Sequence, residues 1–435
     1  MAAIEKPPSE RRALIEAIIA STVGTTIEWY DFFLYGTAAA LVFPKLFFPE
    51  FDPFVGQILS FGTFTVGFVA RPLGGIVFGY LGDRIGRKST LVATLLLMGI
   101  STVIIGVLPT YSRIGPWAPI LLTGLRFLQG LGVGGEWGGA VLLALEYGHR
   151  GRRGFFASWP QTGVPLGLLL STGVMGTMQG LLAEEVFLRW GWRLPFLLSG
   201  VLIAVGLLIR SRVLETPLFR QLLATKQVAH APLRETVIRH WREILLAAGA
   251  RIAENSCFYL FSTYVIAYAR DVLNLQSGLA LRAVLAAALC EFAAMPLYGI
   301  LSDYWSRRAM YMVGCISLLL FAFPYYGLLH TREPALVFVA VVISLVGSHA
   351  ILYSVQASLI PELFGTRLRY TGASLGYQMA APLAGGMAPL IAASLVKAFP
   401  GQYWPLALYV AATALISFIS VYFLAETSRK DLSGN

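Results

Sequence analysis

Charged residues, cysteines and histidines are all scarce in this chain. Of its 435 residues 13% are charged, about half the share of an ordinary soluble protein, whereas 57% are hydrophobic. The three cysteines and five histidines show no spacing typical of a disulfide framework or a metal site. This composition argues against a soluble domain, and we expect no metal, no cofactor and no enzyme activity.

Long apolar stretches fill the sequence instead. About twelve of them reach the length of roughly 20 residues with which an α-helix crosses a bilayer. Continuous apolarity predicts helices, because the strands of a membrane barrel are short and alternate in polarity. The predicted fold class is therefore an all-α membrane protein with twelve transmembrane helices. The expected spans are residues 17–43, 55–82, 89–109, 117–146, 154–180, 194–214, 243–270, 277–303, 308–329, 335–360, 368–398 and 402–425.

The net charge of +10 is distributed unevenly between the two sides of these spans. If the N-terminus is cytoplasmic, 22 of the 33 Lys and Arg residues fall on that side and eight fall on the other. This distribution follows the positive-inside rule, so we expect an inner or plasma membrane protein with both termini in the cytoplasm. Since the charge forms no concentrated stripe, nucleic acid is not an expected partner.

The chain contains two related halves. Three landmarks recur at offsets of 220, 216 and 211 residues, namely Asp83 with Asp303, Glu146 with Glu362, and Glu215-Thr216 with Glu426-Thr427. Duplicated halves are common in secondary transporters, which bind substrate between the halves near the middle of the membrane. The predicted parts are a cytoplasmic tail 1–16, a six-helix bundle 17–214, a cytoplasmic linker 215–242, a second six-helix bundle 243–425 and a cytoplasmic tail 426–435.

The turn at residues 79–88, Gly-Tyr-Leu-Gly-Asp-Arg-Ile-Gly-Arg-Lys, is the most specific motif. Its glycines allow two helix ends to approach closely, and Asp83 can accept hydrogen bonds from the N-terminus of a neighbouring helix. We expect a gating or structural role for Arg71, Asp83, Arg84, Arg87, Lys88, Asp303 and Arg307. No glycine stands directly before Lys88, so the turn is not a phosphate loop, and ATP is not the expected energy source.

At this turn the chain resembles the major facilitator superfamily, and further segments narrow the likeness to its metabolite:proton symporter family. These segments are Glu28-Trp29-Tyr30-Asp31-Phe32-Phe33, Arg71-Pro72-Leu73-Gly74-Gly75, Arg126-Phe127-Leu128-Gln129-Gly130 and Trp190-Gly191-Trp192-Arg193. The resemblance covers nearly the whole chain and is greatest to shikimate and α-ketoglutarate permeases. It implies two pseudo-symmetric six-helix halves and transport of a small organic acid together with a proton.

Three acidic residues inside the spans are candidates for proton coupling, namely Asp31, Glu28 and Glu136. A charge in hydrocarbon costs at least a few kcal/mol, so such residues usually face a bundle interior. Glu28 and Asp31 are three residues apart on one helix face, and two neighbouring carboxylates in low dielectric do not both ionise cheaply. The alternatives are a static ion pair of either acid with Arg71 or Arg126 and a structural role for Glu136.

Arg126 is the expected ligand of an anionic substrate, because a guanidinium group binds a carboxylate through two parallel hydrogen bonds. Its alternative is a permanent pairing with an acid of the first span. The other candidate substrate-binding residues are Gln161, Arg251, Glu254, His349, Tyr377 and Gln378. Arg251 and Glu254 could instead form a self-contained pair, and His349 a neutral ring bonded to a carbonyl or hydroxyl group. Glu291 has no partner in the sequence, and we assign it no role.

The sequence therefore predicts a proton-coupled symporter that imports a small organic acid, shikimate-like or a di- or tricarboxylate, by alternating access. The alternative within this class is a symporter of a zwitterion or osmolyte such as proline or betaine. A membrane-embedded enzyme or a channel is less consistent with the duplicated halves and gating turns. The expected partners are the organic anion, the proton as coupling ion and the lipid bilayer, and the expected state is a monomer.

Overall fold

The computed structural model describes residues 10–148, 151–212, 215–225, 231–276 and 278–430, and over these residues the chain forms helices and no strands. Within this described part of the chain, ten helical segments are long and apolar enough to cross a membrane. Two further long helices, α1 (Glu10–Leu41) and α6 (Trp117–Tyr147), carry the acids and arginines expected to face the bundle interior. The all-α, twelve-helix fold class predicted from the sequence is confirmed.

Each half contributes six membrane helices, several of them interrupted. Those of the first half are α1, α3 (Pro53–Ile85), α4 (Arg87–Val107), α6, α7 with α8 (Arg153–Gln161, Gly163–Leu181) and α10 (Arg193–Arg212). Those of the second are α12–η2–α13 (Pro232–Tyr259, Leu260–Tyr264, Val265–Asp271), α14 (Leu279–Tyr304), α15 (Arg307–His330), α16–η3–α17 (Pro334–Ser344, Leu345–His349, Ala350–Glu362), α18–η4–α19 (Arg369–Gln378, Ala381–Gly386, Ala388–Ala398) and α20 (Trp404–Tyr422). Short helices α2 (Phe43–Phe47), α5 (Tyr111–Ile114), α9 (Glu184–Val186) and α11 (Pro217–Ala224) lie between them, and a five-residue segment η1 (Phe187–Gly191) leads into α10.

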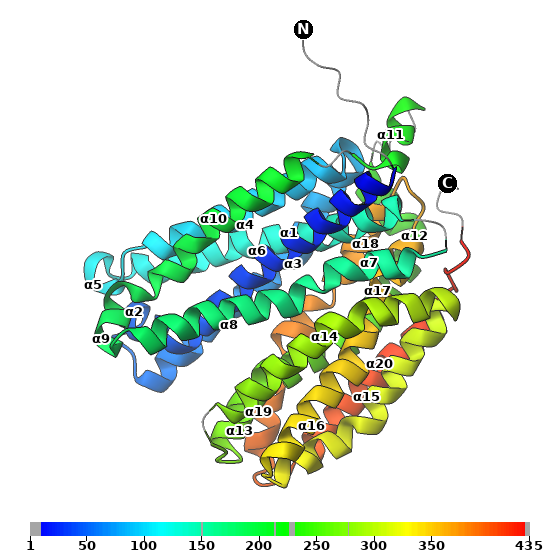
Figure 1. The fold of residues 1–435 in the computed structure, drawn as a ribbon. Helices are drawn as coiled ribbons and strands as arrows, with labels where there is room; N and C mark the ends of the chain where they lie inside the picture. The colour runs from blue at the N-terminus through cyan, green and yellow to red at the C-terminus, as the bar shows by residue number, and fades with distance from the viewer. Residues whose placement is uncertain (1–9, 149–150, 213–214, 226–230, 277, 431–435) are drawn as a thin grey trace.

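The start of α1 and the last described residues lie at the same end of the two bundles (Figure 1). We call this end the terminal face and the other end the opposite face. The two bundles lie close together at the terminal face and diverge toward the opposite face (Figure 1). Large apolar side chains such as Leu208, Leu320 and Leu383 are exposed on the outside of the bundles, where the bilayer would cover them.

Glycines bring α3 and α6 into close contact, and this contact positions two arginines. A Cβ atom at Gly134 of α6 would overlap with the backbone carbonyl of Arg71 on α3. At Gly67 of α3 it would lie 2.6 Å from Arg126 Nε. Because glycine has no side chain, the helices can approach and the long side chain of Arg126 still fits between them.

The seventh membrane helix begins earlier than the sequence predicts. We expected residues 215–242 to be a polar linker, but α12 already starts at Pro232, and α11 occupies residues 217–224. The polar beginning of α12 joins the membrane part at His240, which has a non-helical backbone (φ −125°, ψ 23°). Hydropathy marks only the part of a helix inside the bilayer, so it misses a helical extension into water.

Three π-helical segments interrupt the membrane helices of the second half. They are η2, η3 and η4, and each lies in the middle of its membrane helix. π-Helical turns widen a helix locally and are frequent at functional sites. His349 is the last residue of η3, so this segment places its imidazole ring inside the second half.

Candidate functional site

A chain of hydrogen bonds connects Arg126 to Asp31 inside the first half. Arg126 Nη1 donates to Gln129 Oε1 at 3.2 Å, and Gln129 Nε2 donates to Thr102 Oγ1 at 2.7 Å. The Thr102 hydroxyl faces Asp31 Oδ2 at 2.9 Å and the Met98 carbonyl oxygen at 3.0 Å. With two acceptors available, this hydroxyl can turn away from Asp31 without losing its hydrogen bond.

Asp31 is held by hydroxyl groups rather than by a cation. Ser199 of α10 donates to the second oxygen of the carboxylate, so α4 and α10 both contact this acid of α1. The side chain is buried, and within the described residues it forms no ion pair with Arg71 or Arg126. The static pairing considered for Asp31 is therefore absent in this state.

Arg71 and Arg126 lie among aromatic rings with part of their hydrogen-bonding capacity unused. The guanidinium carbon of Arg71 lies 4.5 Å from the centroid of Phe32 and 4.6 Å from that of Phe68. That of Arg126 lies 4.6 Å from Phe32 and 4.8 Å from Phe64. Both arginines are buried, and their Nε and Nη2 atoms have no hydrogen-bond partner in the part of the chain described. Such groups are costly to leave unpaired, which makes them candidates for binding an anion.

Glu136 has a partner that the sequence analysis did not identify. It pairs with Arg210 of α10 and accepts a hydrogen bond from Thr94 at 2.6 Å. A Cβ atom at Gly24 of α1 would overlap with the Arg210 guanidinium, so glycine makes room for this pair. These contacts favour the structural alternative for Glu136. Glu28 keeps one carboxylate oxygen, Oε2, without a hydrogen-bond partner among the described residues.

Four ionisable side chains form a buried cluster in the second half. Arg251 Nη1 lies 3.6 Å from Glu254 Oε2, and the other oxygen of Glu254 lies 3.5 Å from His349 Nε2. His349 Nδ1 lies 2.6 Å from Glu291 Oε1. The pairing of Arg251 with Glu254 matches one of the two alternatives from the sequence. The partners of His349 are carboxylates, not the carbonyl or hydroxyl group considered above, and Glu291 gains a defined neighbour.

The remaining candidate substrate ligands take part in contacts between the halves. Gln161 accepts a hydrogen bond from Trp137 Nε1 at 3.0 Å and donates to the Tyr353 carbonyl at 2.6 Å. The rings of Trp137 and Tyr377 stack with centroids 3.6 Å apart. Gln378 Nε2 donates to the carbonyl of residue 134 at 3.1 Å. In this state, therefore, these side chains join the halves, and both ends of the Gln161 amide are occupied.

Each half places one aspartate against a helix of the other half at the terminal face. Asp83 accepts hydrogen bonds from the backbone N–H groups of Tyr370 at 3.2 Å and Thr371 at 2.8 Å, in the first turn of α18. Asp303 accepts them from residues 154 and 155, in the first turn of α7, at 2.8 and 2.9 Å. A carboxylate is favourable at a helix N-terminus because the N–H groups there are free and the helix dipole is positive.

Each of the two aspartates is surrounded by an equivalent polar network. In the first half it joins Arg87 to Asp83 at 3.5 Å and to Glu146 at 3.5 Å. In the second half it joins Arg307 to Asp303 at 2.7 Å and to Glu362 at 3.4 Å. Each central glutamate also accepts a threonine hydroxyl, Thr216 at 2.6 Å in the first half and Thr427 at 2.7 Å in the second. The three landmarks that recur in the sequence thus meet in one network in each half.

A further glutamate closes each network from outside the membrane helices. Glu215 accepts the backbone N–H groups of Arg87 at 3.1 Å and Lys88 at 3.2 Å, and Glu426 accepts those of Arg307 and Arg308 at 3.1 Å. Partial burial acts to raise the pKa of Glu426, but hydrogen bonds from Ser306, Ser428 and Arg308 outweigh it and hold the pKa below its usual value.

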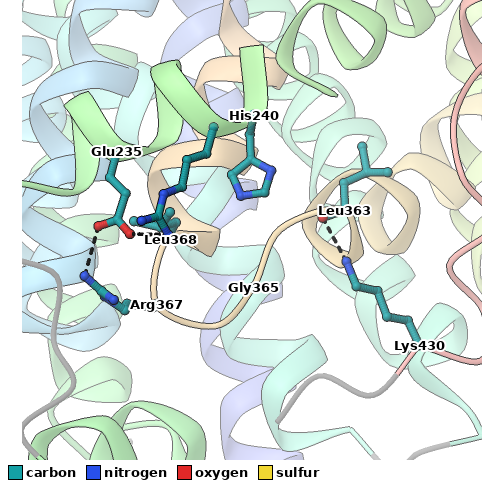
Figure 2. Close-up of a pocket in the computed structure, with 8 residues that line it drawn as sticks. Glu235, His240, Leu363, Gly365, Arg367, Leu368 and Lys430 are labelled. Atoms are coloured by element: carbon teal, nitrogen blue, oxygen red, sulfur yellow. Dashed lines mark hydrogen bonds and ion pairs between the residues drawn. The ribbon is translucent and has the colours of Figure 1, made fainter. Parts of the chain in front are cut away.

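The other two basic residues of the turn face outward. Arg84 is exposed and contacts the Tyr80 hydroxyl, and Lys88 Nζ donates to the Ser211 carbonyl at 3.0 Å. A pocket of about 340 Å³ also opens at the terminal face, near the beginning of α12 (Figure 2). There Arg367 donates to Glu235 at 2.9 Å and Lys430 donates to the Leu363 carbonyl at 2.9 Å (Figure 2). These contacts tie the second half together at its surface, and none of the proton-coupling candidates lines the pocket.

Further residues of the site become recognisable only in the structure. Arg210 follows an apolar run near the end of its helix. The count of Lys and Arg residues on the two sides of the membrane therefore assigned it to a loop. Thr102 and Ser199 are ordinary residues of membrane helices, and their role follows only from the hydroxyl contacts with Asp31. Gln129 was visible as the polar residue one helical turn after Arg126, a spacing that places both on one helix face.

Comparison with known proteins agrees with this architecture. The sequence profile of the Major Facilitator Superfamily matches residues 22–377. The chain is 40% identical over 422 residues to the inner membrane metabolite transport protein YhjE of Escherichia coli K12, covering 96% of this chain and 95% of that protein. It is 38% identical over 416 residues to the shikimate transporter of the same organism, covering 95% of each, and 34% identical over 430 residues to the proline/betaine transporter, covering 97% of this chain and 85% of that protein.

Solved structures show the same fold at low sequence identity. The proton:xylose symporter XylE bound to 6-bromo-6-deoxy-D-glucose superposes with a TM-score of 0.79 at 16% identity, covering 98% of each chain. An inward open conformation of XylE from Escherichia coli gives 0.65 at 15% identity, covering 96% of this chain and 98% of that one. With the family profile over most of its length and full-length relatives that are transporters, this chain is a multi-pass membrane transporter and belongs to the Major Facilitator Superfamily.

Proposed function

We propose that the protein imports a small organic acid together with a proton by alternating access, with the terminal face in the cytoplasm. The observation that carries this proposal is the hydrogen-bond chain from Arg126 through Gln129 and Thr102 to Asp31. It connects a guanidinium with free N–H groups to a buried acid that has no cationic partner among the described residues. A substrate anion at one end can therefore influence a proton at the other end.

The coupling step follows from the contacts of Asp31. When Asp31 is ionised, the hydroxyls of Thr102 and Ser199 donate to it. Its negative charge then competes with a substrate carboxylate for electrostatic attraction to the Arg126 guanidinium. Once Asp31 takes a proton, Thr102 can turn to the Met98 carbonyl, and Arg126 is left to bind the substrate. The proton and the anion thus favour each other's binding, as symport requires.

The surroundings of the two arginines favour an acid over an osmolyte. A quaternary ammonium group is recognised by the open faces of aromatic rings. Here the guanidinium groups of Arg71 and Arg126 already cover Phe32, Phe64 and Phe68, and they offer unpaired N–H donors instead. The relatives include transporters of both kinds, so the preference rests on this geometry.

The networks at the terminal face are proposed to hold the cytoplasmic side closed. Asp83 and Asp303 each bind a helix N-terminus of the other half, supported by Arg87 and Arg307. Rocking of the halves toward an inward-facing state must break these bonds. Since one chain supplies both halves of the site, we propose a monomer as the functional unit.

Competition for uptake tests the substrate class. We expect proteoliposomes containing the protein to take up radiolabelled shikimate, and excess α-ketoglutarate, citrate or benzoate to inhibit this uptake where the acid fits the site. Glycine betaine should have no effect at the same concentration. Inhibition by betaine alone, with no response to any acid, would assign the arginines structural roles and favour an osmolyte transporter.

A further inference from the structure

The cluster of Arg251, Glu254, His349 and Glu291 has no role in the coupling step derived above. It lies in the second half, across the interface from Arg71 and Arg126, and each of the four side chains is at most 3% exposed. Hydrocarbon surroundings make every unbalanced charge costly, so the protons that such a cluster holds depend on its total charge.

The position of His349 between two carboxylates implies that the cluster holds a proton. Nδ1 faces Glu291 at 2.6 Å and Nε2 faces Glu254 at 3.5 Å. A neutral imidazole has only one N–H group, so its other nitrogen would point a lone pair at a carboxylate oxygen. With a proton on each ring nitrogen, two cations balance two anions and the cluster is neutral.

Arg251 is the member of the cluster that reaches the interface between the halves. Its guanidinium carbon lies 3.0 Å from the ring centroid of Tyr377, and that ring stacks on Trp137 of the first half. Its Nε and Nη1 atoms have no hydrogen-bond partner in the described part of the chain, and its ion pair with Glu254 is long at 3.6 Å. It can therefore accept an anion without leaving a well-formed hydrogen bond.

We propose that this cluster is a second proton site, which takes up one proton when the substrate anion engages Arg251 and releases it with the substrate. The inference rests on the proposed symport and adds a second proton to the one assigned to Asp31. The charge balance gives the mechanism. When one carboxylate of a dicarboxylate lies on Arg126, a second carboxylate on Arg251 brings the neutral cluster to a charge of −1, and a proton on Glu254 restores neutrality. That proton comes from the side to which the site is open and leaves to the other side.

Within the described residues, no other group near His349 replaces this function. The rings of Phe258 and Tyr353 cover it at centroid distances of 4.8 and 5.2 Å. The further titratable groups that face the cluster from α12, α14, α15, α17 and α18 are thiols and phenols, which are neutral near pH 7: Cys257, Tyr259, Tyr298, Tyr311, Cys315, Tyr353 and Tyr377. Arg71 of α3 is a charged group that faces Tyr259 and Tyr377 from the first half, but arginine does not exchange protons. The change in charge therefore rests on the four residues of the cluster.

Counting the protons taken up when α-ketoglutarate binds tests this inference. Calorimetric titration of the purified protein in two buffers of different ionisation enthalpy gives this number directly. We expect about two protons per α-ketoglutarate for the wild type, about one for Asp31→Asn, about one for Arg251→Gln/Glu254→Gln and none for the variant carrying all three changes. Arg251→Gln/Glu254→Gln removes one cation and one anion together, so the rest of the cluster stays neutral but no longer engages the anion.

Ser344→Ala is the matched control, because Ser344 is buried in the same membrane helix as His349 and its hydroxyl donates to the Ala340 and Val341 carbonyls of that helix. It should keep about two protons per α-ketoglutarate. Two protons in Arg251→Gln/Glu254→Gln, or only one in the wild type that is lost in Asp31→Asn, would overturn the inference while leaving the proposed symport intact. Two protons in Asp31→Asn would instead contradict the role of Asp31, and no proton uptake by the wild type would contradict both.

Discussion

The acid and the arginine proposed to couple proton and substrate do not touch. Thr102 and Gln129 stand between Asp31 and Arg126, and three hydrogen bonds make up the chain, two of which involve Thr102. A hydrogen bond to a charged group stabilises by about 1.5–3 kcal/mol. The proposed coupling between Asp31 and Arg126 therefore depends on two uncharged side chains.

Replacement of Thr102 tests this dependence. Thr102→Val keeps the shape but removes both links, so we expect the stimulation of uptake by an inward proton gradient to fall about tenfold or more, with exchange at equal pH retained. The measurement is shikimate uptake with and without the gradient. Ser101→Ala is the control, because the one hydrogen bond that the Ser101 hydroxyl forms within the described residues is to the Leu97 carbonyl of its own helix. Equal stimulation in Thr102→Val and wild type would exclude the relay.

The guanidinium shape of Arg126 is the second feature to test at this scale. Arg126→Lys keeps the charge but loses the planar pair of donors, so the KM for shikimate should rise about 10- to 100-fold. Arg84→Lys, an exchange of the same kind at the exposed end of α3, should leave KM unchanged. An unchanged KM in Arg126→Lys would show that Arg126 does not bind the carboxylate through two donors.

Among the elements, the N-termini of α7 and α18 are proposed to hold the terminal face closed. Asp83→Asn should weaken its two bonds to the first turn of α18, since an amide accepts more weakly and donates where another acceptor is needed. In Asp83→Asn, we expect spin labels at residues 84 and 239, one in each half, to report a larger share of long label-to-label distances than in the wild type. The exposed Asp271→Asn is the control. Unchanged distances in Asp83→Asn would show that this contact does not limit opening.

The loop acid Glu426 gives a prediction about pH. Its folded-state pKa is lowered, so its contribution to stability is present above the pKa of a free glutamate, about 4.3, and is lost as the pH falls through the folded value. Glu426→Gln should therefore lower the thermal unfolding temperature at pH 7, and the difference from wild type should shrink toward pH 4. Glu333→Gln, an exposed acid, should behave like wild type at both pH values. A difference that grows as the pH falls would contradict this assignment.

Sequence patterns predicted those parts of the elements that repeat or that lie inside the bilayer. The hydrogen bonds expected for Asp83 are present because a recurring turn dictates a recurring geometry. The start of α12 was missed because its first turns are polar. Glu136 with Arg210, and Glu291 with His349, are separated by 74 and 58 residues, and helical spacing carries no information about partners so far apart.

Taken as a whole molecule, the protein is in a state closed at the terminal face. Hydrogen bonds of Asp83 and Asp303 join the halves there, and the bundles diverge toward the opposite face (Figure 1). Asp31 lies between this closed layer and the opposite face, as do Arg71 and Arg126, whose Nε and Nη2 atoms are unpaired among the described residues. This arrangement suits a transporter awaiting substrate from outside the cell, if the terminal face is cytoplasmic as proposed.

Gradient-driven accumulation is the most direct test of proton-coupled import. Proteoliposomes containing the wild type should concentrate radiolabelled shikimate above the external level when an inward proton gradient is imposed, and a protonophore should abolish the excess. Asp31→Asn should still exchange shikimate but should not concentrate it. Accumulation by Asp31→Asn equal to that of the wild type, or wild-type uptake that never exceeds the external level, would contradict the account.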